Sequence, residues 1–209
     1  SVKIRLCSYS FNPPVEFGNL FRGCFYIFDA ISHCEESTLF IDPDIIAVDK
    51  ISDIGLTCGE KYGVFILKFP LNKLINGLTP EAASRIYSNY CKDSGLTNVG
   101  FPLGHLGGEV LFVPKVKILE LRTKIKDFWN WNTSAAKRGD YYLTTEEHIF
   151  THIIIENEYV PINSYISRIW TTKRFTRHEG NNKSLYELKL WHLPAEKSRG
   201  FLTHVKKVI

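Results

Sequence analysis

Two aspartates, Asp42 and Asp44, stand on either side of a proline between two short apolar runs of the sequence. The runs, 38–41 and 45–48, are rich in β-branched and apolar residues, so we expect each to form a strand that the proline prevents from continuing into the other. Paired carboxylates at the end of a buried strand can bind a divalent cation that in turn neutralises phosphates. A turn in which both aspartates accept hydrogen bonds from backbone N–H groups is the alternative interpretation.

A second group of acidic residues precedes an apolar run near residue 150. The segment Thr144-Thr145-Glu146-Glu147 has the Ser/Thr-x-x-Glu form of a helix capping box. We predict that Glu147 is the capping partner of Thr144. This assignment leaves Glu146 free for proton transfer, and it is the first of four candidates for a general base, the others being Glu147, Glu109 and Asp140.

The histidines allow fewer conclusions. His148 and His152 have the i,i+4 spacing of two zinc ligands on a helix, but Ile149 stands where an HExxH motif needs its glutamate, so we do not predict a zinc protease. His192 follows a tryptophan in the last strand-like run. From its surroundings alone it can be either a core histidine or a metal ligand.

The composition is that of an ordered globular domain. The chain has 209 residues, of which 44% are hydrophobic and 23% charged. No apolar run reaches the roughly 18–20 residues of a membrane span, and the five cysteines contain no CxxC pair. We therefore expect a soluble, cytoplasmic protein with reduced thiols and no transmembrane segment.

The basic residues gather towards the end of the chain. Residues 168–209 hold ten Lys or Arg and three Asp or Glu, a local charge of +7 within a net charge of +4. Such an end can bind phosphate groups, and a nucleotide is a better candidate than a nucleic acid because the basic residues are spaced among apolar ones. No nucleic-acid partner is expected.

Periodicity along the chain alternates between strand and helix patterns. Strands are predicted at 2–9, 37–48 with its interruption, 62–69, 109–113, 162–172 and 184–193, and helices at 17–31, 79–91, 121–131 and 148–155, with a loop at 100–105. The fold class that this order predicts is α/β, a single domain with a mixed central sheet flanked by helices.

Four segments, in this order along residues 17–200, resemble nucleotide-sugar glycosyltransferases of the GT-A fold. They are Phe21-Arg22 with the Asp-Pro-Asp strand, Gly107-Gly108-Glu109, Thr145-Glu146-Glu147-His148, and Trp191-His192-Leu193-Pro194-Ala195-Glu196-Lys197. The resemblance implies a single glycosyltransferase-like domain over 1–209, with a nucleotide- and metal-binding half at 1–105 and an acceptor-side half at 106–209. Only about forty residues precede the Asp-Pro-Asp segment, fewer than a complete GT-A nucleotide-binding half contains.

The same resemblance assigns roles to individual residues. Asp44 and His192 would ligate Mn²⁺ or Mg²⁺, Asp42 would hold the ribose or a metal-bound water, and Lys197 would neutralise the diphosphate. The other substrate-binding residues that it implies are Arg22, Gly107, Gly108 and Asp140, with Glu146, Glu147 and Glu109 as the catalytic candidates. The implied reaction moves a sugar from a UDP- or GDP-sugar to a glycan or to a protein- or lipid-linked hydroxyl acceptor.

Two other functions fit parts of the sequence. The segments around Arg22 and Glu109 resemble mono-ADP-ribosyltransferases, which use NAD and no metal. In that case Glu109 would be the catalytic carboxylate and Arg22 a phosphate or ribose contact. A non-enzymatic carbohydrate- or nucleic-acid-binding module, in which the aspartates bind Ca²⁺ or nothing, is the third hypothesis.

Overall fold

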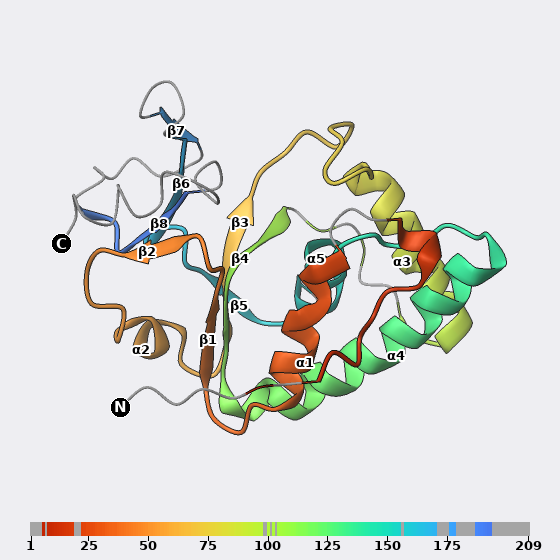
Figure 1. The fold of residues 1–209 in the computed structure, drawn as a ribbon, viewed down its shortest axis with the longest axis horizontal. Helices are drawn as coiled ribbons and strands as arrows, with labels where there is room; N and C mark the ends of the chain where they lie inside the picture. The colour runs from red at the N-terminus through yellow and green to blue at the C-terminus, as the bar shows by residue number, and fades with distance from the viewer. Residues whose placement is uncertain are drawn as a thin grey trace.

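The computed structural model describes residues 6, 8–18, 22–97, 100, 102, 104–155, 157–170, 176–178 and 187–193. They form an α/β domain with two four-stranded mixed sheets and several helices, which confirms the predicted fold class (Figure 1). No helix in this part of the chain is both long and apolar enough to cross a membrane.

The first sheet has the strand order β1-β4-β3-β5. Its members are β1 (Thr38–Ile41), β4 (His105–Val113), β3 (Tyr62–Leu67) and β5 (Tyr159–Pro161). Strand β4 pairs antiparallel with both β1 and β3, whereas β5 runs parallel to β3. Nearly every residue of β3 and β4 is buried, which explains the apolar runs of β3 and of the second half of β4 in the sequence.

Four helices lie together on one side of this sheet: α1 (Tyr26–Ser32), α3 (Pro80–Ser94), α4 (Ile118–Arg138) and α5 (Glu146–Ile155) (Figure 1). The helical layer also includes three short 3-10 turns: η1 (Val15–Phe17), η2 (Arg22–Phe25) and η3 (Lys115–Lys117). Helix α2 (Ile54–Cys58) lies apart from this layer, near β2. The largest core cluster fills the space between helices and sheet, with Phe28, Leu121, Phe128 and Ile149 fully buried.

The second, smaller sheet has the order β2-β8-β6-β7. It consists of β2 (Ile45–Ala47), β8 (Leu190–His192), β6 (Ile166–Trp170) and β7 (Thr176–His178). Strand β2 pairs antiparallel with β8, and β8 runs parallel to β6. The chain passes from the first sheet to the second across residues 42–44, so the predicted interruption is the point where the two sheets meet.

The helix predicted at 79–91 is confirmed and slightly longer, because Thr79 Oγ1 accepts the N–H of Ala82 at 3.1 Å and Gly95 ends the helix in the left-handed conformation. The helix predicted at 121–131 extends to Arg138, since Ala135 and Ala136 continue its buried face. The helix predicted at 148–155 begins at Glu146.

Other predicted boundaries were wrong. The strand predicted at 162–172 begins at Ile166, and the strand predicted at 184–193 is formed only by Leu190–His192 among the described residues. The helix predicted at 17–31 is divided into η1, η2 and α1, and Gly18 adopts φ +68°, which no helix can include. Strand β4 begins at His105 instead of Glu109, because His105 and Leu106 pair with the end of β3. Residues 8–10 form no strand; the rest of the strand predicted at 2–9, except Leu6, lies outside the described residues, as do 171–172 and 184–186 of the late strands.

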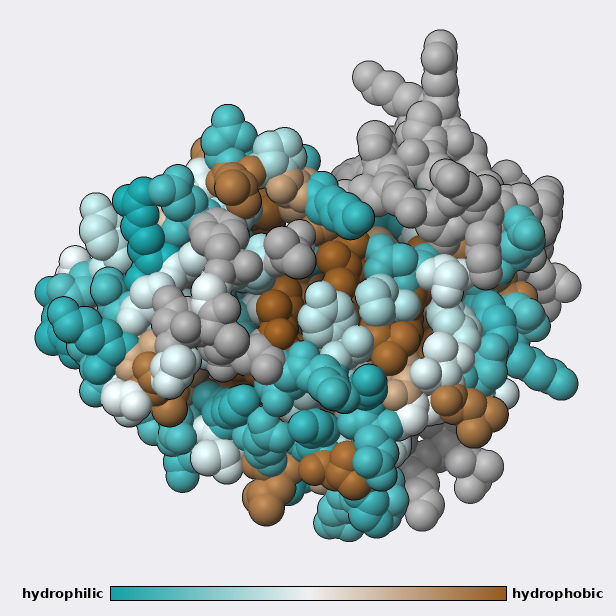
Figure 2. Space-filling view, turned by 180° about the vertical axis from the view of Figure 1, so that it is seen from behind, coloured by the Kyte–Doolittle hydropathy of each residue, from teal (hydrophilic) through white to brown (hydrophobic). Residues whose placement is uncertain are grey.

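The face opposite to that of Figure 1 is uneven in polarity (Figure 2). Hydrophobic atoms lie in a hollow near its middle and hydrophilic side chains surround them. Hydrophilic residues therefore border an apolar area on this side of the molecule.

Candidate metal centre

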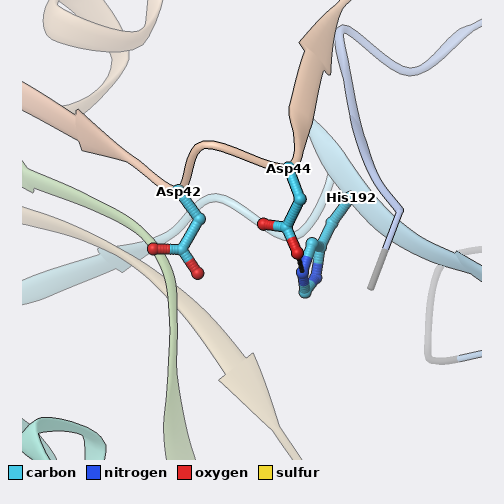
Figure 3. A group of neighbouring side chains, drawn as sticks. All are labelled: Asp42, Asp44 and His192. Atoms are coloured by element: carbon cyan, nitrogen blue, oxygen red, sulfur yellow. Dashed lines mark ion pairs between the residues drawn. The ribbon is translucent and has the colours of Figure 1, made fainter. Parts of the chain in front are cut away.

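Asp42, Asp44 and His192 meet where the two sheets join (Figure 3). Each can offer one ligand atom, and these atoms lie within 4.8 Å of one another. Asp44 and His192 are buried and Asp42 is half-buried. The structure thus brings together the three residues for which the sequence predicted a metal site.

The strand pairing explains this convergence. The N–H of Asp42 donates to the carbonyl of Glu109 at 3.0 Å, which ends the pairing of β1 with β4, and the N–H of Ile45 donates back to the carbonyl of Asp42 at 3.1 Å. In the second sheet, Ile45 stands opposite His192. The N–H of Leu193 donates to the carbonyl of Asp44 at 3.0 Å, so backbone hydrogen bonds fix both sides of the site.

The imidazole of His192 lies between two carboxylates. Nε2 is 3.4 Å from Oδ2 of Asp44, and Nδ1 is 3.3 Å from Oε1 of Glu109. Burial acts to lower the pKa of His192, but its contacts with Asp44 and Glu109 outweigh burial and raise the pKa to about 9. Without a metal, this histidine is the cation that neutralises the site.

Glu109 is a buried carboxylate with only 2% of its surface exposed. Its Oε1 pairs with the guanidinium of Arg168 on β6, while its Oε2 is buried with no hydrogen-bond partner. A Cβ on Gly107 would lie 2.1 Å from Oε2 and 2.8 Å from a ring carbon of Phe65, so only glycine fits at position 107. The first glycine of the Gly-Gly-Glu segment thus makes room for this carboxylate.

The donor chemistry fits a divalent transition metal. Two carboxylates and one imidazole form a mixed oxygen and nitrogen set that Mn²⁺ accepts, whereas Mg²⁺ favours oxygen ligands alone. The buried negative charge of Asp44 and Glu109 favours a cation at this place. The residues present therefore fit Mn²⁺ better than Mg²⁺.

Glu147, at the start of α5, lies next to the contacts of Glu109, since its Oε1 is 3.9 Å from the Arg168 guanidinium that pairs with Glu109. Its carboxylate accepts the N–H of Gly108 at 2.9 Å and the side-chain amide of Asn76 at 2.7 Å, and it lies 3.2 Å from Nε2 of His105. Burial acts to raise the pKa of Glu147, but the contacts with His105 and with the Gly108 N–H are stronger and lower it.

The predicted capping box was wrong. Thr144 donates its hydroxyl to the carbonyl of Asn76 at 3.1 Å, and it is Thr145 whose Oγ1 accepts the N–H of His148, at 3.4 Å. The physical reason is the close approach of Gly108, whose N–H is a better placed donor for Glu147 than the helix terminus.

Glu146, the residue that the sequence left free for proton transfer, lies close to Asp42 and Glu147. Burial is the largest cause that raises its pKa, followed by the charge of Glu147, and the pKa reaches about 8 despite a hydrogen bond with Cys24. Tyr26, at the first position of α1, interacts with Asp42. The turn before α1 therefore contributes Cys24 and Tyr26 to the surroundings of the site, and the sequence did not indicate either.

The remaining predicted site residues lie elsewhere. Arg22 donates to the carbonyls of Pro13, Pro14 and Gly18 and so holds the N-terminal loop. Asp140 is exposed after the end of α4 and pairs with Arg138 at 2.9 Å. Lys197 lies outside the described residues. Sequence reasoning missed Arg168, although a single charge between the apolar Ile166 and Ile169 of a predicted strand is a signal that could have found it.

Comparison of the chain with families of known proteins and with curated proteins gives no match.

Proposed function

We propose that this chain is a metal-dependent glycosyltransferase that moves a sugar from a nucleoside-diphosphate sugar to a hydroxyl acceptor. The convergence of Asp42, Asp44 and His192 supports the proposal most strongly, because these residues come from two segments far apart in the sequence and form the cluster that the resemblance implied. A bound Mn²⁺ would supply positive charge for the departing diphosphate. Asp44 and His192 would hold the ion, with Asp42 as the third donor.

The acidic residues then take different parts in the reaction. In an inverting transfer, a carboxylate accepts the proton of the acceptor hydroxyl, and the hydroxyl oxygen forms a bond to the anomeric carbon of the donor sugar. The bond between that carbon and the diphosphate oxygen breaks, and the diphosphate leaves with its electron pair. Glu146 is the best candidate for this base, and because its pKa is about 8 it can accept the proton only at alkaline pH, where it is ionised. Glu147 is held by Gly108 and Asn76, and Glu109 by Arg168, so neither is as available for proton transfer.

The ADP-ribosyltransferase hypothesis is less well supported. It requires Glu109 to reach a substrate, but Glu109 is 2% exposed and faces Arg168 and His192. It also requires Arg22 to contact a phosphate or ribose, and that guanidinium donates to backbone carbonyls. The geometry therefore favours sugar transfer.

Thermal unfolding with Mn²⁺, Mg²⁺ or EDTA, each combined with UDP, GDP, CDP and NAD, tests the proposal. A ligand at about 100 times its dissociation constant adds about 2.7 kcal/mol, which raises the midpoint by several degrees at this chain length. We expect a shift that needs both Mn²⁺ and one nucleoside diphosphate. A shift with NAD in EDTA would instead support ADP-ribosyl transfer, and no shift would contradict both enzymes.

Four variants make the test specific. Asp44→Ala and His192→Ala should abolish the combined shift, whereas Asp49→Ala, an exposed aspartate of the same segment, should keep it. Glu146→Gln should lower transfer and leave donor affinity unchanged, and a transfer rate within about threefold of the parent would remove Glu146 from the chemistry.

A further inference from the structure

A recess separate from the metal cluster lies between the loop after β3, the first turns of α3, the start of β4 and one face of α5. Its lining includes Phe69, Leu71, Ile75, His105, His148 and His152. The enclosed part of the recess has a volume of about 40 Å³, and the recess with its open mouth measures about 450 Å³. A ligand could insert a group of a few heavy atoms and keep the rest of its body in the mouth.

In two of the three imidazoles that line this recess, both ring nitrogens lie within hydrogen-bonding distance of a polar group. His148 has Nε2 3.0 Å from the carbonyl of Ile75 and Nδ1 2.9 Å from the hydroxyl of Thr145. His105 contacts Glu147 through Nε2 and the hydroxyl of Thr151 through Nδ1. These contacts fix both rings in place.

His152 differs from its two neighbours. Its side chain is 4% exposed and its ring stacks on Tyr87, with centroids 4.8 Å apart and an interplanar angle of 14°. Within the described part of the chain, neither of its ring nitrogens has a hydrogen-bond partner. Neither nitrogen belongs to the fully buried side-chain atoms that lack a partner, so a polar group that enters the recess can reach the ring.

The residues that line the recess indicate which kind of ligand could contact His152. Burial, followed by the charges of His148 and His105, lowers the pKa of His152 to about 3, so the ring is neutral near pH 7 and does not attract an anion. The neutral ring offers one N–H donor and one nitrogen acceptor, and a hydroxyl can satisfy either. Phe69, Leu71 and Ile75 provide apolar surface for the rest of the molecule.

We propose that this recess binds a small uncharged molecule with an apolar body and one hydroxyl group, and that the hydroxyl meets His152. Phenol is the simplest probe of this class, because its hydroxyl and the edge of its ring fit the inner space while the ring lies against Phe69 and Leu71. The proposal goes beyond the glycosyltransferase function and does not depend on it.

Titration of the full chain with phenol, followed by NMR of the histidine imidazole signals, tests the site. We expect saturable shifts of the His152 and His148 signals with a dissociation constant on the order of 1 mM, and toluene should bind at least fivefold more weakly because it lacks the hydroxyl. Benzoate should bind more weakly than phenol, because its carboxylate would have to give up water beside the neutral ring of His152. Since the ammonium of Lys73 lies over Phe69, 4.1 Å from the ring centroid, Lys73→Gln is used to separate any attraction of benzoate to that cation.

Variants separate the hydroxyl contact from the apolar one. His152→Phe keeps a ring against Tyr87 and should weaken phenol at least fivefold while leaving toluene unchanged, and His33→Phe, at an exposed histidine, should change neither. Leu71→Ser, at a side chain that is 59% exposed and so does not support the core, should weaken both probes. Thermal unfolding of each variant verifies that it is folded.

Two results would overturn the proposal: no saturable shift up to 20-fold above the expected dissociation constant, or equal phenol affinity in the parent and His152→Phe. The variant Asp44→Ala tests whether phenol binding is independent of the proposed metal site. That variant should lose Mn²⁺ binding and bind phenol as the parent does, so either hypothesis can fail while the other stands.

Discussion

Oε1 of Glu109 lies 3.3 Å from Nδ1 of His192, and this contact joins a carboxylate of the first sheet to an imidazole of the second. Arg168 pairs with the same oxygen from β6. The ring of His192 is thereby turned so that its other nitrogen faces Asp44. A carboxylate behind a metal-ligating histidine fixes the orientation of the ring and raises its basicity.

Glu109→Gln should therefore weaken Mn²⁺ binding by 10- to 100-fold, the usual effect of losing the carboxylate behind a ligating histidine. Calorimetric titration of Mn²⁺ measures this change. Glu158→Gln, which removes an exposed carboxylate paired with Lys61, is the control and should bind Mn²⁺ as the parent does. If Glu109→Gln keeps the parent's Mn²⁺ affinity, Glu109 does not orient His192.

Gly108→Ala should destabilise the protein by about 1–3 kcal/mol, the usual cost of overpacking. The new Cβ would lie 2.7 Å from Oε1 of Glu146 and 3.0 Å from Cγ of Glu147, so these two side chains at the start of α5 must move, and Glu147 would lose its bond with the Gly108 N–H. Urea unfolding measures the loss. Gly23→Ala is the matched control, since its Cβ would have no neighbour within 4 Å. Equal losses in the two variants would mean that α5 does not pack on Gly108 as described.

The sequence predicted much of the fold because its local signals were strong. Thr79 with Pro80 marked the start of α3, and the apolar spacing of Leu121, Ile125 and Phe128 marked the buried face of α4. The sequence did not show that the strands form two sheets. That division depends on which segments pair with β2, and pairing between segments so far apart has no local signal.

The convergence of Asp42, Asp44 and His192 was predictable because motif order indicated it, but the surroundings of these residues were not. Glu109 was predicted as a catalytic carboxylate, and only the tertiary structure shows that it faces Arg168 and His192. The role of Glu147 was misassigned for the same reason. Its competing donor, the N–H of Gly108, lies 39 residues away in the chain.

The raised pKa of Glu146 predicts a pH-dependent stability. The folded pKa is about 8 and the ordinary value is 4.5, so between these pH values the folded state holds a proton that the unfolded state has released. The free energy of unfolding should then decrease as pH rises from about 4.5 to about 8. One pKa unit corresponds to about 1.4 kcal/mol, so the total change is several kcal/mol.

Urea unfolding in EDTA at pH 5 and pH 8.5 measures this effect. Glu146→Gln, which cannot ionise, should lose most of the difference between the two pH values. Glu36→Gln, at an exposed glutamate, should keep it. The histidines His148, His152 and His192 contribute alike to the pH dependence of both proteins, so an equal change in the parent and in Glu146→Gln would contradict the burial of a protonated Glu146.

The buried histidines predict the opposite slope at lower pH. Burial and the neighbouring His105 lower the pKa of His148 to about 4, and burial with the charges of His148 and His105 lowers that of His152 to about 3. Between about pH 6.5 and pH 4 the unfolded state binds protons that the folded state excludes. The free energy of unfolding should therefore fall as pH falls through this range.

This acid effect is best measured in the Glu146→Gln background, because protonation of Glu146 stabilises the folded state over part of the same range. Urea unfolding at pH 7 and pH 4.5 should show a loss of stability, and adding His152→Phe should make that loss smaller by removing one of the two groups that must stay neutral. Adding His33→Phe instead, at an exposed histidine, should leave the loss unchanged. If the loss persists in full with His152→Phe, the acid sensitivity arises elsewhere and His152 is not held neutral by burial.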